Sequence, residues 1–194
     1  MRIKFTTIFP AVALLLFASA SHAQSGHMSS EVPGVVLLTH SLDARKLFPG
    51  ATFQTRLIDT IHLNNGTKLP SGTLLTGTVV QDDMQPEGRV TFALRFSEAR
   101  LKNGKTIPIM ATVLDVSTGT EAVENEQSAF EPVLVVPRNL TSQSDHVDVI
   151  DVNPGIDLHG SANSPNSGVF VATTKNDIRF PTYTQIELAL APGV

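Results

Sequence analysis

Residues 69–116 read LPSGTLLTGTVVQDD, MQPEGRVTFALRFSEARL and KNGKTIPIMATVLDV, a pattern that predicts three successive β-strands joined by two turns. The middle segment, residues 89–101, alternates apolar and polar side chains with the period of a half-buried strand. Its apolar face consists of Val90, Phe92, Leu94 and Phe96. The pair Asn103-Gly104 predicts a type I′ turn, because both residue types tolerate positive φ, and therefore an antiparallel hairpin that continues into residues 106–115.

The rest of the chain favours the same structural class. Charged residues make up only 16% of the 194 residues, and 12 Pro and 13 Gly divide the chain into short segments. Residues 51–63 and 182–190 also alternate, as expected for strands. We therefore predict an all-β fold, an antiparallel β-barrel or sandwich formed as a single domain by residues 35–194, with long loops near residues 117–129 and 141–167.

One carboxylate interrupts the apolar face of the strand predicted at residues 51–63. Phe53, Thr55, Leu57, Ile61 and Leu63 share this face with Asp59. The strand either leaves the core or bulges at Asp59, or it buries the carboxylate. We expect the first, because Asp is seldom fully buried without a partner.

The N-terminus has the features of a secretory signal peptide. Arg2 and Lys4 precede a largely apolar run at residues 8–20, and Ser21-His22-Ala23 provides the small residues that signal peptidase requires. The run is shorter than the roughly 20 residues that cross a bilayer, so we expect no transmembrane anchor in the mature chain. The sequence thus predicts a signal peptide at residues 1–23, a flexible leader at residues 24–34, and a periplasmic or secreted protein.

Charge and cysteine content narrow the functional classes. The chain carries 18 acidic and 14 basic residues, and two of the basic residues belong to the predicted signal peptide. Nucleic-acid-binding domains usually present a basic patch, so we expect no nucleic-acid partner. There is no Cys, which excludes disulfides and a lipid-modified cysteine, and the fold must be stabilised by burial of its core.

The densest group of polar side chains lies in residues 145–159. Carboxylates and imidazoles are metal ligands, but the spacing lacks the pattern of an EF-hand or an HExxH site, and a solvated edge strand explains the alternation equally well. No GxSxG elbow or phosphate-binding loop occurs elsewhere. We therefore assign no catalytic residue, cofactor or metal, and keep six residues as candidate ligands only: Asp145, His146, Asp148, Asp151, Asp157 and His159.

Short motifs in the central stretch resemble the β-domain of TrbI-type proteins, the outer-membrane core scaffolds of type IV secretion and conjugation. The matching residues are Pro70, Gly72, Thr73, Gly77, Gly88, Arg89, Asn103, Gly104, Ile107 and Asp115. The chain is also similar to short secreted proteins of unknown function from soil bacteria such as acidobacteria. The resemblance covers residues 69–115 and implies a β-barrel or sandwich; the cytoplasmic segment, membrane anchor and proline-rich stalk of the scaffold proteins have no counterpart here.

These observations lead to two functional hypotheses. The first is an exported β-domain without catalysis, which binds or scaffolds in the bacterial envelope through a protein partner or self-association at a strand edge. The alternative is a hydrolase of envelope polymers that uses residues 145–159. Convergence of these side chains in a concave pocket would favour the hydrolase, and a splayed surface arrangement would favour the binding domain.

Overall fold

A computed structural model describes residues 31–80, 90–118, 145–173 and 178–193. Several predictions from the sequence fall outside these ranges and remain predictions. They concern the signal peptide, the leader as far as residue 30, most of the loop at 117–129, and the motif residues Gly88 and Arg89.

The described residues form strands and turns. The strands are β1 (Val32–Leu38), β2 (Leu42–Asp43), β3 (Thr52–Leu57), β4 (Ile61–His62), β5 (Lys68–Leu69), β6 (Leu74–Val80), β7 (Thr91–Arg100), β8 (Thr106–Ser117), β9 (His146–Asn153), β10 (Ile156–Ser161), β11 (Gly168–Ala172), β12 (Arg179–Phe180) and β13 (Gln185–Pro192).

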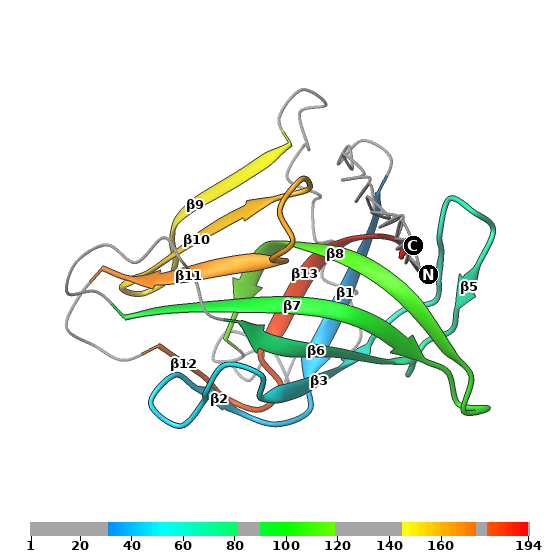
Figure 1. Ribbon diagram of the computed structural model, residues 1–194, viewed down its shortest axis with the longest axis horizontal. Coiled ribbons are helices and arrows are strands. Elements are labelled where there is room, and N and C mark those ends of the chain that lie inside the picture. Colours follow the sequence, from blue (N-terminus) through cyan, green and yellow to red (C-terminus); the bar gives the residue numbers. More distant parts are fainter. Residues whose placement is uncertain (1–30, 81–89, 119–144, 174–177, 194) are drawn as a thin grey trace, which may run out of the picture.

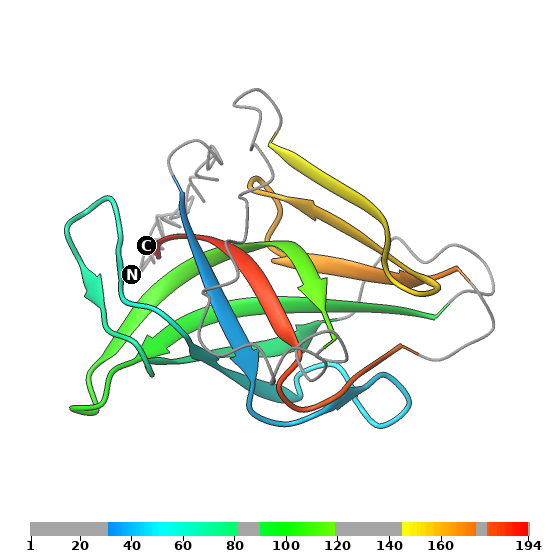
Figure 2. The ribbon, with the colours of Figure 1, turned by 180° about the vertical axis from the view of Figure 1, so that it is seen from behind.

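Six of these strands close into an antiparallel barrel. The order is β6–β3–β1–β13–β8–β7, and β7 pairs back with β6. Figures 1 and 2 show this barrel from opposite sides, with β1 (blue) and β13 (red) on the side nearest the viewer in Figure 2. The predicted all-β antiparallel barrel is thereby confirmed.

The central hairpin is confirmed, but its turn differs from the prediction. Arg100 pairs with Thr106, and the Gly104 N–H donates to the Leu101 carbonyl at 2.9 Å. Gly104 has φ of 83°, whereas Asn103 is not among the described residues with positive φ. The connection is therefore a three-residue loop with glycine in the left-handed conformation, rather than a type I′ turn. The Asn103 side chain stabilises it by accepting a hydrogen bond from the Lys105 N–H at 3.0 Å.

The alternation in β7 changes phase once. Phe92, Leu94 and Phe96 are buried as predicted, but the next buried side chain is Ala99. The register with β6 shifts at this point, since Thr76 pairs with Glu98 and Gly77 with Phe96. This β-bulge places one extra residue in β7 and reverses which positions face the core.

The strand predicted at residues 51–63 leaves the core at Asp59, as expected. β3 ends at Leu57, Asp59 is exposed, and the chain re-enters the interior at Ile61 in β4. The first strand, in contrast, begins earlier than predicted. Val32 already pairs with Leu190 of β13, and Gly34 lets the Leu190 side chain approach closely, so the structured domain includes part of the predicted leader.

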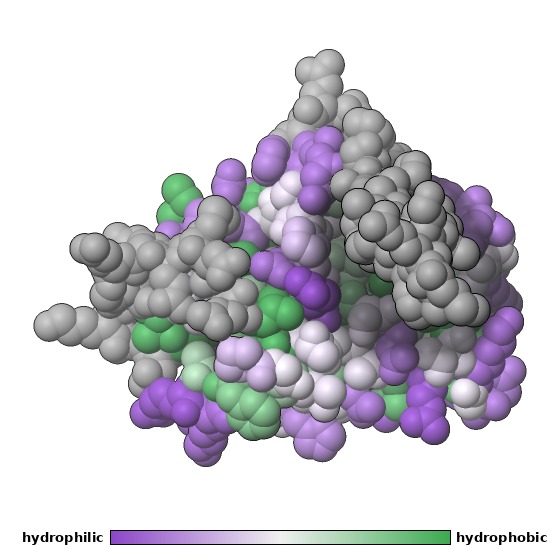
Figure 3. Space-filling view, in the orientation of Figure 1, coloured by the Kyte–Doolittle hydropathy of each residue, from purple (hydrophilic) through white to green (hydrophobic). Residues whose placement is uncertain are grey.

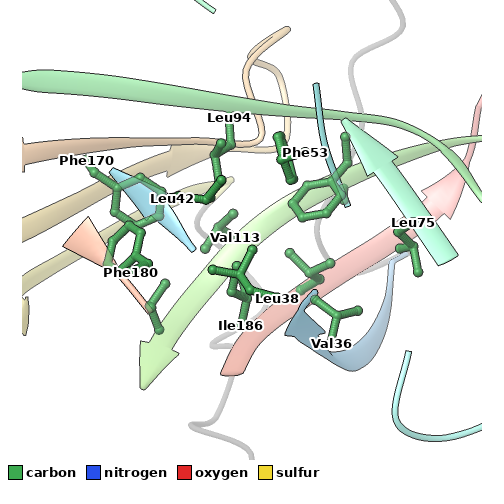
Figure 4. Packing of buried hydrophobic residues seen from close by; sticks show 14 of the residues in the cluster. Val36, Leu38, Leu42, Phe53, Leu75, Leu94, Val113, Phe170, Phe180 and Ile186 are labelled. Carbon is green, nitrogen blue, oxygen red and sulfur yellow. The ribbon is translucent and has the colours of Figure 1, made fainter. Parts of the chain in front are cut away.

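The core is filled by aliphatic side chains and a group of aromatic rings. Phe170 lies 5.0 Å from Phe180 and 5.6 Å from Phe92, measured between ring centroids. Figure 4 shows Phe170 and Phe180 together with Leu42 at one end of the core, and Phe53 farther along it. Phe53 packs edge to face against Phe96 at 5.0 Å. These contacts connect the barrel wall to β11 and β12.

Three further strands extend the barrel sheet beyond β7, in the order β11–β10–β9. In Figure 1 they form a layer that diverges from the barrel and ends in β9, coloured yellow. The prediction of a long loop at residues 141–167 was therefore wrong for residues 146–161, which form an antiparallel hairpin. The turn of this hairpin contains Asn153-Pro154-Gly155, a sequence typical of turns.

Candidate functional site

The β9–β10 hairpin carries five of the six candidate residues, and the sixth, Asp145, directly precedes β9. The side chains are distributed over three places along the hairpin. Among the residues that the structure describes, no three His, Asp or Glu side chains are grouped closely enough to hold a metal ion. The following contacts define what each of these side chains does.

His159 and Asp148 form a cross-strand pair in the middle of the hairpin. The distance from Asp148 Oδ1 to His159 Nδ1 is 2.8 Å, and the two side chains are 70% and 46% exposed. Exposed ion pairs typically contribute no more than about 1 kcal/mol to stability. The pair therefore has the character of a surface contact between directly opposed strand residues.

Asp151 and Asp157 stabilise the turn of the hairpin. The Gly155 N–H donates to Asp151 Oδ1 at 2.6 Å, and the Asp151 N–H donates to Asp157 Oδ1 at 2.9 Å. Asp151 has φ of 57°, a left-handed conformation that Asp tolerates better than most residues. The register irregularity between Ile156 and Leu158 lies beside this turn. Both carboxylates thus satisfy backbone groups in an irregular segment.

Asp145 and His146 lie at the opposite end of the hairpin. Asn163 Nδ2 donates to Asp145 Oδ2 at 3.1 Å, and the Ala162 N–H donates to the Asp145 carbonyl at 2.9 Å. His146 is exposed at the start of β9. These contacts connect the beginning of β9 to the loop that follows β10.

The most distinctive feature of the hairpin is its outer edge. β9 is the last strand of the nine-stranded sheet, and no described strand pairs with its outer side. None of its residues is buried, and Ile150 is 84% exposed. The edge strand suggested by the alternation of residues 145–151 is confirmed. On the face drawn in Figure 3, the described residues form small apolar patches interrupted by polar side chains.

A second site, which the sequence analysis missed, lies where β7 and β8 diverge. The two strands pair only from Glu98–Arg100 to Thr106–Pro108. Beyond that point β7 pairs with β11, while β8 continues along β13. The gap between them contains a cavity of about 350 Å³.

Ser167 closes one end of this gap with three hydrogen bonds. Its N–H donates to the Leu94 carbonyl at 2.7 Å, its hydroxyl accepts from the Phe96 N–H at 2.9 Å, and its carbonyl accepts from the Val113 N–H at 2.7 Å. Residues 161–167 were expected to be a plain loop. Residues 162–167 do form a loop, and its last residue, Ser167, connects β7 to β8 at the point where the two strands no longer pair.

Glu31 lines the cavity from the segment that precedes β1. Burial, and next the negative charge of Asp145, raise the pKa of the Glu31 carboxyl to about 7, while a hydrogen bond with the Thr112 side chain opposes the shift. The sequence assigned Glu31 to the leader. Its surroundings come from residues far away in the chain, so no local pattern indicated them.

The chain has a structural likeness to a protein of known structure. ComB10 of the Com type IV secretion system of Helicobacter pylori has a TM-score of 0.41 and 10% sequence identity to this chain, over 85% of this chain and 86% of that one. No protein-family model matches the chain, and no curated protein matches it. Within the described residues, no helix is long and apolar enough to span a membrane. A likeness of this degree assigns neither a family nor a function to the chain.

Proposed function

We propose that the chain is an exported β-domain of the bacterial envelope, without catalysis, that binds a protein partner by adding a strand to the outer edge of β9. The single observation that carries this proposal is the open edge itself. A sheet edge presents unpaired backbone donors and acceptors, which an extended segment of another chain can pair with. Each barrel strand pairs with a strand on either side over at least part of its length, whereas β9 has a described neighbour on one side only.

The two halves of β9 differ in their suitability for strand addition. From His146 to Val149 the register with β10 is continuous, which leaves a regular backbone for a partner. Near Asp151 the left-handed residue and the adjacent irregularity distort the strand. Bulges of this kind and charged edge residues are devices that limit indiscriminate pairing between sheets. We expect the partner to pair with residues 147–149 and to contact Ile150 at the end of that segment.

The hydrolase alternative receives no support from the same geometry. Asp151 and Asp157 are occupied with backbone N–H groups, and the His159–Asp148 pair is solvent-exposed rather than placed in a concave pocket. A general acid or base requires access to a bound substrate in a defined position. The described part of residues 145–159 is splayed along a surface hairpin.

Site-specific photo-crosslinking tests the proposed interface. A photoreactive phenylalanine analogue at Ile150 should capture a discrete partner in envelope extracts, or a second copy of this chain. The same analogue at Phe48, which is 66% exposed in the turn after β2, is the matched control and should capture none. Equal capture at both positions would contradict the β9 edge. N-terminal sequencing of the exported protein should return Gln24, and a start at Met1 would contradict export by a cleaved signal peptide.

A further inference from the structure

The cavity between β7 and β8 has a composition suited to a small ligand. Its walls combine apolar groups with a few polar ones, and its volume of about 350 Å³ is near the lower end of the range for ligand pockets. The walls come from five segments: the residue before β1, part of β7, part of β8, the loop after β10, and the residue after β13. The lining residues used below are Glu31, Arg95, Phe96, Pro108, Ile109 and Thr112.

The Glu31 carboxyl is the least satisfied polar group in this wall. The Thr112 side chain, itself only 3% exposed, forms a hydrogen bond with it. Glu31 Oε2, however, is buried and, among the residues that the structure describes, has no hydrogen-bond partner. A buried oxygen without a partner costs free energy that a suitable donor can recover. Glu31 is one of the residues that line the cavity, so a guest bound there lies next to this side chain.

The charges around the carboxyl favour a cationic donor. Asp145 is close enough for its charge to act on Glu31, so two carboxylates share this region. Arg95 lines the same cavity, but its Nε donates to the Pro165 carbonyl at 2.8 Å and its Nη2 to Asn166 Oδ1 at 3.2 Å. These bonds direct the guanidinium to the loop. A bound cation would offset the repulsion between the two acids.

The apolar part of the wall indicates which chemical group carries the positive charge of the ligand. Phe96, Pro108 and Ile109 offer hydrocarbon surface beside the carboxyl. A guest with a compact charged head and an unbranched hydrocarbon stem can use both kinds of surface, whereas a hydrated inorganic cation can use only one. We propose that this cavity binds a primary ammonium group on a short alkyl stem, with Glu31 as its anionic partner. This binding site is independent of the β9 edge.

Binding and ionisation of Glu31 are coupled. The ammonium group prefers the ionised carboxylate, so a bound amine lowers the pKa of Glu31 from its value of about 7. Affinity for the amine should therefore rise by about fivefold between pH 6 and pH 8, as the carboxyl loses its proton. In the described residues Asp145 is the charged group that acts on this carboxyl, and Arg95 lines the same cavity with its guanidinium bonded to the loop.

Carbon NMR of the Glu31 carboxyl, recorded on the whole purified protein during titration with n-pentylamine, tests the proposal. Saturating amine should lower the pKa of Glu31 by about one unit, which corresponds to a tenfold preference for the ionised form. The uncharged n-pentanol, of equal length, should leave the pKa unchanged. An equal response to both compounds, or no response to the amine, would overturn the proposal without the need for a variant.

A variant and a second ligand test the role of Glu31 and the source of the amine. Glu31→Gln should reduce amine affinity at pH 8 by about tenfold, the factor that corresponds to one pKa unit, whereas the matched change Glu98→Gln on β7, outside the cavity, should not. Undiminished binding by Glu31→Gln would contradict the assignment of the site. Tighter binding of Nα-acetyl-lysine methylamide than of pentylamine would identify a protein lysine as the natural guest, and the reverse order would identify a free alkylamine.

Discussion

The closed barrel and the three-stranded extension are both built of antiparallel strands, but they differ in how many side chains each strand buries. In the extension, burial decreases outward: all five residues of β11 are buried, β10 buries Ile156 and Leu158, and β9 buries none. In the barrel, by contrast, every strand contributes side chains to one continuous core. The same core also includes side chains of β10 and β11, so the difference teaches that the extension is anchored by its inner strands and leaves its last strand, β9, with an edge that a partner can reach.

The largest effect is expected at the junction of the two regions. Phe170→Ala removes a ring that is fully buried against Phe92 and Phe180, and should lower the free energy of unfolding by about 3–5 kcal/mol. Phe48→Ala, at a position 66% exposed, is the matched control and should change it by less than about 0.5 kcal/mol. Urea denaturation measures both. Equal losses would mean that the junction is not part of the cooperative core.

Within the barrel wall, Gly77→Ala should be the next most damaging change. An added Cβ would lie 2.4 Å from the Arg95 carbonyl oxygen and 2.5 Å from Phe53 Cζ, at the bulge that resets the alternation of β7. We expect this crowding to lower the free energy of unfolding by about 2–3 kcal/mol. Gly104→Ala is the control, because nothing lies within 4 Å of its added Cβ and only the backbone conformation is strained. Its positive φ should lower the free energy of unfolding by about 1 kcal/mol. A larger loss for Gly104→Ala in thermal denaturation would reverse this order.

Glu31→Gln should stabilise the protein, but only at neutral and alkaline pH. The folded-state pKa of about 7 exceeds the ordinary value of 4.5, so the folded chain binds more protons than the unfolded chain between these limits. Stability is therefore lost as the pH rises through this window, and the glutamine removes the loss. Allowing for partial exposure, we expect a gain of about 1–2 kcal/mol at pH 8 and none at pH 4. A gain of equal size at pH 4 would contradict the role of ionisation.

The smallest effect is expected on the extension. Asp148→Asn breaks the exposed pair with His159 and should change stability by no more than about 0.5 kcal/mol. Val149→Ala, the neighbouring change on β9 without loss of charge, serves as the comparison. A loss above 2 kcal/mol for Asp148→Asn would show that the hairpin contributes to the stability of the barrel, and that the two regions are less distinct than their burial indicates.

Local patterns were sufficient to predict the central hairpin, the exit of the strand at Asp59 and the terminal strand, because each depends on residues that are neighbours in the chain. The phase change in β7 was not predictable, since the glycine that accommodates it lies on another strand. The β9–β10 hairpin could have been found from Asn153-Pro154-Gly155 and the alternation on either side of it. The cavity could not, because Glu31, Thr112 and Asp145 come together only through tertiary pairing.

The pairing of β1 with β13 has a consequence for how the protein folds. Val32 lies opposite Leu190, so this seam joins segments from the two extremes of the described chain. Contacts of such high sequence separation are slow to form, because a long loop must be closed before any interaction compensates for its entropy. The hairpins of β6, β7 and β8 can form early, whereas the barrel wall is completed only when the segment containing β13 is available. A chain that passes through a membrane unfolded would therefore acquire its final shape after translocation rather than during it.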